Sequence, residues 1–180
     1  IKIDKVTIFD IDGNLVDRPI HFSKVQIGQV DKGNYAHYMH KEIFDQPQAI
    51  RDTLESRITN DSVIVSSFGY KAENLFKDIK QVQIVGCGTS FNAGLVAKYW
   101  MEDIAKIPCN VEIASEYRYR KPIILDNTLF VTISQSGETA DTIEALKAAK
   151  KINNTLNTIS ISNSAESSLC LLYTSDAADE

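Results

Sequence analysis

The chain has 180 residues, of which 43% are hydrophobic and 24% charged, the balance of a globular protein with one domain and an appended segment. Its net charge of −5 argues against a nucleic-acid-binding protein, because such proteins concentrate Lys and Arg against phosphates. The longest apolar runs fall short of the roughly 18 residues that a membrane span needs. Three widely spaced cysteines form neither a disulfide framework nor a zinc motif, which suits the cytoplasm.

Residues 1–18 contain two apolar runs on either side of Asp12-Gly13. This dipeptide readily adopts the positive φ angles of a tight turn, so the segment is predicted to form a β-hairpin. The chain begins at Ile1, inside what looks like a strand, and we expect the natural N-terminus to lie further upstream. The polar stretch that follows contains Gly28 and Gly33 and is predicted to be a linker.

Apolar residues recur at helical spacing between residues 38 and 58, and again between residues 72 and 79. Pro47 interrupts the first of these segments, because proline removes a backbone donor and clashes with the preceding turn. We therefore expect two helical pieces that meet at Pro47, followed by one short helix.

Strands and helices then alternate to the end of the predicted domain. The expected strands span residues 82–86, 110–114, 128–133 and 158–162, and the expected helices span residues 90–104 and 139–151. This alternation predicts a three-layer α/β/α fold around a parallel sheet of four strands. The apolar face of the helix that contains Trp100 is expected to pack in the core.

Two of the strand-to-helix loops combine glycine with hydroxyl side chains. They read Gly86-Cys87-Gly88-Thr89-Ser90 and Ser134-Gln135-Ser136-Gly137-Glu138-Thr139. Ligands of open parallel sheets bind at such loops, where free N–H groups at a helix start attract an anion. Helix capping explains either loop alone, but two of them on one sheet favour a ligand site. Neither has the lysine of a P-loop, so the sequence predicts a phosphomonoester held by uncharged donors.

Several longer segments carry a specific family resemblance. They are His37-Tyr38-Met39-His40-Lys41-Glu42-Ile43, Cys87-Gly88-Thr89-Ser90, Glu112-Ile113-Ala114-Ser115-Glu116-Tyr117-Arg118-Tyr119-Arg120 and Ser134-Gln135-Ser136-Gly137-Glu138-Thr139-Ala140-Asp141-Thr142. Over roughly three quarters of its length the chain resembles the first sugar isomerase (SIS) domain of the isomerising glutamine–fructose-6-phosphate aminotransferases, also called glucosamine-6-phosphate synthases. The opening hairpin is similar to the end of that family's glutaminase domain.

The resemblance implies a function and a set of site residues. The family makes glucosamine 6-phosphate from fructose 6-phosphate and glutamine, and its full-length members imply a homodimer. No metal, organic cofactor, nucleic acid or membrane is implied. The residues implied to hold the sugar phosphate are Thr89, Ser90, Ser134, Gln135, Ser136 and Thr139. Cys87 lies beside them and is interpreted as a small packed residue rather than a nucleophile.

The resemblance also implies a domain organisation. Residues 1–36 would be the hairpin and linker, residues 37–169 an SIS domain truncated before its last strand, and residues 170–180 a tail that does not match the family. The family's catalytic carboxylate and lysine belong to its second SIS domain, so no catalytic residue is expected here. We expect this chain alone to be inactive.

Two other functions stay open at this stage. A regulatory SIS module that senses a sugar phosphate would carry the same loops. A haloacid dehalogenase-type phosphatase would use Asp10 as nucleophile and Asp12 as acid, with magnesium, although no clear helix follows them. His37 and His40 lack a third metal ligand at a sensible spacing. The basic residues Arg118, Arg120 and Lys121 are interpreted as a solvated or interface surface.

Overall fold

The computed structural model describes residues 7–17, 32–69, 72–164 and 166–174, with side chains as far as residue 172. The chain divides into two units, Ile1–Ile58 and Thr59–Glu180. Among the described residues, no helix has the length and apolar character needed to cross a membrane.

The first unit contains the predicted hairpin. Strand β1 (Ile8–Phe9) pairs antiparallel with β2 (Leu15–Val16). The Asp10 carboxylate holds the turn, because its Oδ1 accepts hydrogen bonds from the backbone N–H groups of Asp12 (3.0 Å) and Asn14 (2.8 Å). The pKa of Asp10 is lowered, chiefly by the Asn14 backbone bond. The hairpin is therefore confirmed, and it gives Asp10 a structural role.

Helix α2 (Tyr38–Leu54) also belongs to the first unit, and it corrects one prediction. Pro47 lies inside this continuous 17-residue helix and does not divide it. One polar pair with a spacing of four residues lies on each side of the proline. Lys41 bonds to Asp45 before it, and Gln48 bonds to Asp52 after it. Such pairs favour the helix on each side of the one missing backbone bond. Most of the predicted linker lies outside the described residues.

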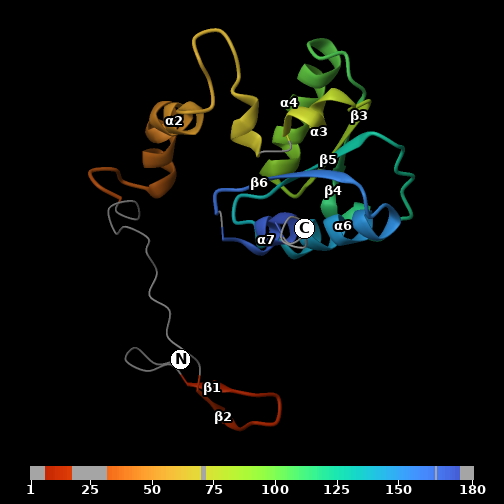
Figure 1. Cartoon of the computed structure of the whole chain (residues 1–180). Coiled ribbons are helices and arrows are strands. Elements are labelled where there is room, and N and C mark those ends of the chain that lie inside the picture. The colour runs from red at the N-terminus through yellow and green to blue at the C-terminus, as the bar shows by residue number, and fades with distance from the viewer. Residues whose placement is uncertain (1–6, 18–31, 70–71, 165, 175–180) are drawn as a thin grey trace. The chain divides into compact units, whose positions relative to one another are not determined.

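The second unit is built on a parallel sheet, as predicted (Figure 1). Its strands are β3 (Gln81–Gly86), β4 (Cys109–Ile113), β5 (Thr128–Ile133) and β6 (Asn157–Ile161), in the order β4-β3-β5-β6. Every neighbouring pair is parallel. The carboxyl ends of all four strands therefore lie at one edge of the sheet.

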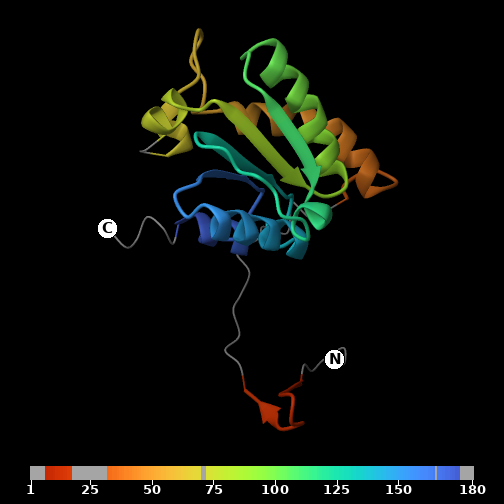
Figure 2. The same cartoon turned by 90° about the vertical axis from the view of Figure 1, so that its right-hand side faces the viewer.

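Helices cover both faces of this sheet (Figure 2) and give the predicted three layers. The 3₁₀ helix η1 (Val65–Phe68) leads into α3 (Ala72–Lys77), which packs with α4 (Thr89–Asp103) on one face. The other face carries α5 (Ala114–Tyr117), α6 (Ala140–Ile152) and α7 (Ser168–Thr174). Phe130 of β5 is fully buried under α6 with Leu146 and Ala149.

The predicted burial of the Trp100 face of α4 is wrong within this unit. Trp100 is 62% exposed and Tyr99 is 72% exposed. The helix instead turns Gly94 toward the sheet, where an added Cβ would lie 3.0 Å from Val111 and 3.1 Å from Ile84. The missing side chain lets the backbone of α4 approach the strands, which directs the large side chains outward.

Candidate functional site

A pocket opens at the carboxyl edge of the sheet, where the loops after β3, β5 and β6 meet. Its volume is about 260 Å³. The lining residues are Thr89, Ser90, Ala93, Ile133, Ser134, Gln135, Ile161, Ser162 and Asn163. The two hydroxyl-rich loops predicted from the sequence thus share one pocket, because β3 and β5 are neighbours in the sheet.

The first wall of the pocket is the start of α4. Gly88 is the N-cap residue of this helix, with a φ of 55°, and no side chain caps the helix. Thr89 and Ser90 follow as its first two residues, and within the described chain their hydroxyls make no hydrogen bond. The hydroxyls do not serve as caps, so they are available to a bound molecule.

The second wall is the loop between β5 and α6. Thr139 is the N-cap residue of α6, but its side chain makes no cap hydrogen bond. Its Oγ1 instead shares a 2.9 Å hydrogen bond with Ser134 Oγ, which also accepts one from the Gly137 N–H at 3.1 Å. Ser136 Oγ accepts from the Glu138 N–H at 3.1 Å. These bonds fix the shape of the loop, and the Gln135 side chain makes none within the described chain.

The pocket gathers four of the six residues predicted for the site, namely Thr89, Ser90, Ser134 and Gln135. Ser136 and Thr139 lie on the same loop but are not part of the lining. Cys87 packs against the core cluster of the α6 face, in agreement with its interpretation as a packed residue.

The third wall comes from the loop after β6, which the sequence analysis did not include. It contributes Ser162 and Asn163, and the Asn163 N–H donates to the Gln135 carbonyl at 3.1 Å. The available signal was the run Ser162-Asn163-Ser164 at the end of a predicted strand, which also resembles an ordinary turn.

The lining of the pocket carries no charged side chain, since it consists of hydroxyl, amide and apolar residues. An anion in this pocket would meet neutral hydrogen-bond donors and the N-terminus of α4. Free N–H groups and the helix dipole give such a terminus a partial positive charge. The site therefore suits an anion that is recognised by hydrogen bonds rather than by ion pairing.

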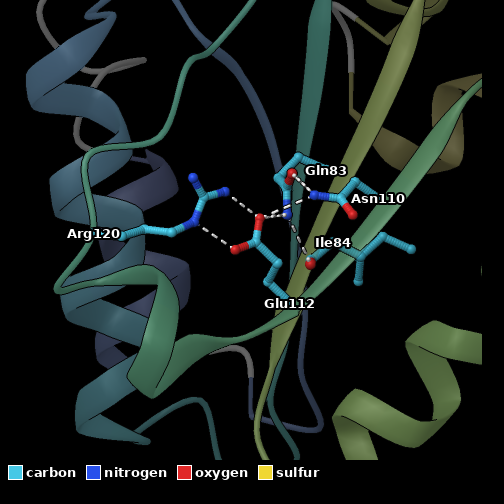
Figure 3. Close-up of polar contacts among 5 residues, drawn as sticks. All are labelled: Gln83, Ile84, Asn110, Glu112 and Arg120. Carbon is cyan, nitrogen blue, oxygen red and sulfur yellow. Dashed lines mark hydrogen bonds and ion pairs between the residues drawn. The ribbon is translucent and has the colours of Figure 1, made fainter.

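The basic residues near the site are used within the fold. Arg118 pairs with Asp141 of α6 at 2.6 Å. The Arg120 guanidinium donates two hydrogen bonds to the Glu112 carboxylate, which also accepts from Gln83 (3.2 Å) and Asn110 (3.0 Å), as Figure 3 shows. The Arg118 contact connects the segment after α5 to α6, and the Arg120 contacts connect it to β4 of the sheet. These hydrogen bonds raise the pKa of both arginines.

Comparison with known proteins agrees with this geometry. Residues 75–174, more than half of the chain, match the family of the SIS domain. The chain belongs to the SIS domain family. It is 52% identical over 164 residues to glutamine–fructose-6-phosphate aminotransferase (isomerizing) of Shewanella oneidensis and 49% identical over 164 residues to that of Yersinia pseudotuberculosis. Each alignment covers 91% of this chain but 27% of the relative.

A solved structure shows the same architecture. The C-terminal domain of glucosamine-fructose-6-phosphate aminotransferase from Francisella tularensis superposes with a TM-score of 0.71 and 48% sequence identity. The match covers 77% of this chain and 39% of that one. The SIS match extends to residue 174 and includes α7, while the boundaries predicted at residues 36 and 169 stay predictions.

Proposed function

We propose that this SIS domain binds the phosphate of fructose 6-phosphate in the pocket between the start of α4 and the loops after β5 and β6. It would do so within the isomerase half of an enzyme that makes glucosamine 6-phosphate from fructose 6-phosphate and glutamine. The observation that carries the proposal is the meeting of the α4 start, which has no side-chain cap, with the hydroxyl- and amide-bearing loops after β5 and β6 in one uncharged pocket. The names of the two relatives described above support the choice of substrate.

The roles of the proposed ligands follow from their bonding. Thr89, Ser90 and Gln135 have side-chain donors free for the phosphate oxygens. Ser134 and Thr139 are hydrogen-bonded to each other, which uses one of their two hydroxyl hydrogens. The other hydroxyl would donate a hydrogen bond to a phosphate oxygen, while the pair keeps the loop in shape. The Ser136 hydroxyl would donate a hydrogen bond to the bound phosphate, since its Oγ acts only as an acceptor in the loop.

We further propose that the domain binds the sugar phosphate and that other parts of the parent enzyme perform the chemistry. Ketose–aldose interconversion needs a general acid or base close to the sugar, and the pocket lining contains no titratable side chain. We propose in addition that the full-length parent enzyme is a homodimer and is cytoplasmic. Cys87 and Cys109, which form no disulfide, support a reducing compartment.

A thermal-shift titration tests the binding site. At a hundredfold excess over Kd, fructose 6-phosphate should raise the melting temperature by roughly 5–10 °C, because it binds the folded state alone. Unphosphorylated fructose should leave it unchanged. Ser90→Ala should reduce the shift, whereas the control Ser66→Ala, on the exposed η1 helix, should not. Equal shifts by both sugars would contradict the phosphate site.

A regulatory SIS module would give the same thermal shift, so a second measurement separates the two functions. In the full-length parent enzyme, Ser90→Ala should lower the rate of glucosamine 6-phosphate formation at limiting fructose 6-phosphate. A parent protein that binds the sugar phosphate but forms no product would favour the regulatory alternative.

A further inference from the structure

The loop between β5 and α6 is hydrogen-bonded to the end of β6, to the loop after it and to the start of α7. The Ser134 N–H donates to the Ile161 carbonyl at 3.0 Å, at the start of the loop. Further along, the Leu169 N–H donates to the Gly137 carbonyl at 3.1 Å. The position of this loop therefore depends on the segment that leads into α7.

Glu138 makes the closest of these connections. Its Oε1 accepts a hydrogen bond from the Ser168 N–H, and its Oε2 accepts one from Ser168 Oγ, both at 2.7 Å. Ser168 is the first residue of α7. Both carboxylate oxygens thus bind one residue, and hydrogen bonds to an ionised group are about twice as strong as neutral ones.

The backbone of Glu138 is hydrogen-bonded within the same loop. Its N–H donates to Ser136 Oγ, and Thr139 follows it directly as the N-cap residue of α6. The pKa of Glu138 is lowered, first by the Ser168 backbone bond and then by the Ser168 hydroxyl, so the carboxylate is ionised at neutral pH. Glu138 therefore links α7 to the residues proposed to hold the phosphate.

We propose that Glu138 is a positioning residue, whose carboxylate fastens the 134–139 loop to α7 and so keeps Ser134, Gln135, Ser136 and Thr139 in place for the phosphate. This inference rests on the proposed function. Because Glu138 is exposed and is not part of the core clusters, its loss should disturb the loop more than the fold.

The test compares Glu138→Gln with Glu144→Gln in the full chain. Glu144, on α6, loses the same charge in the control but bonds to Lys147 rather than to the loop. Calorimetry should show fructose 6-phosphate binding to Glu138→Gln about tenfold more weakly than to the wild type. The melting temperature without ligand should stay within about 3 °C of the wild-type value. Glu144→Gln should match the wild type in both measurements.

Three further readouts identify the bond to Ser168 as the cause. Hydrogen exchange of the amides of residues 136–139 should be faster in unliganded Glu138→Gln. Ser168→Ala should weaken binding, Ser168→Thr should restore it, and the double variant Glu138→Gln/Ser168→Ala should lose less than the sum of the two single changes.

The outcomes distinguish this inference from the function on which it rests. If the wild type does not bind fructose 6-phosphate, the proposed function fails, and the positioning role fails with it. If the wild type binds but Glu138→Gln has unchanged affinity and exchange, the positioning role alone is overturned. If Glu138→Gln binds more weakly and its melting temperature without ligand also falls by more than about 3 °C, the contact is merely structural.

Discussion

Position 137, in the loop after β5, has room for glycine alone. Its φ of 70° lies in the left-handed region, and it is buried. An added Cβ would lie 2.0 Å from Ser167 Oγ and 2.8 Å from Ser162 Oγ, which is far inside van der Waals contact. Backbone conformation and space both exclude a side chain, so glycine lets this loop lie against the segment after β6.

Gly137→Ala should therefore lower the free energy of unfolding by about 3 kcal/mol or more, through strain and a steric clash. The matched control is Gly88→Ala, because Gly88 also has a positive φ of 55° but has open space where its Cβ would be. That change should cost about 1–3 kcal/mol and less than Gly137→Ala, because a side chain is disfavoured at the φ of 55° and ψ of −127° of Gly88 but meets no clash there. Urea unfolding of both variants measures the difference, and equal losses would show that the clash with Ser167 is relieved by movement of the loop.

Among the elements, α4 shows how one small residue sets the orientation of a helix. Gly94 faces Ile84 and Val111, while its neighbour Ala93 is exposed at the pocket. Gly94→Val should push the helix away from the sheet and cost about 1–3 kcal/mol of stability, as other overpacked core positions do. Ala93→Val introduces the same side chain on the same helix and should cost less than about 1 kcal/mol. Thermal or urea unfolding without ligand provides the comparison, and equal costs would contradict the packing argument.

The same helix shows where the sequence pattern was insufficient. Large apolar residues such as Tyr99 and Trp100 define a face by periodicity, but a glycine carries no hydrophobic signal although it can mark the closest contact. Pro47 is a second case, since a residue that usually ends a helix lies inside α2. The strands were predicted to within about a residue, because parallel strands buried on both faces are continuous apolar runs bounded by loops.

The candidate site was predictable in part from the sequence. The loops after β3 and β5 were found from their position and their hydroxyl-rich composition, which a local pattern can show. Their convergence depends on the strand order β4-β3-β5-β6, which local patterns do not encode. The short run at Ser162 and Asn163 was missed because its contribution arises only from the place of β6 beside β5.

At the scale of the whole molecule, the protein and its proposed ligand carry charge of the same sign. The chain carries a net charge of −5, and the ligand proposed for it carries about −2 at pH 8, above the second pKa of a phosphomonoester near 6. Long-range electrostatics therefore oppose binding, and attraction must come from hydrogen bonds and the N-terminus of α4 inside the pocket. Added salt screens the long-range repulsion more than these short-range contacts.

This leads to a test by ionic strength. Between 50 and 500 mM NaCl at pH 8, the Kd for fructose 6-phosphate should change by less than about threefold, because no lysine or arginine lines the pocket. The variant Asn163→Lys would place one cation in the lining, and its affinity should then fall as salt rises, which confirms that the assay detects such a dependence. Calorimetry at both salt concentrations gives the two values. A tenfold or greater loss of wild-type affinity would mean that a cationic side chain reaches the phosphate, and that uncharged donors do not hold it alone.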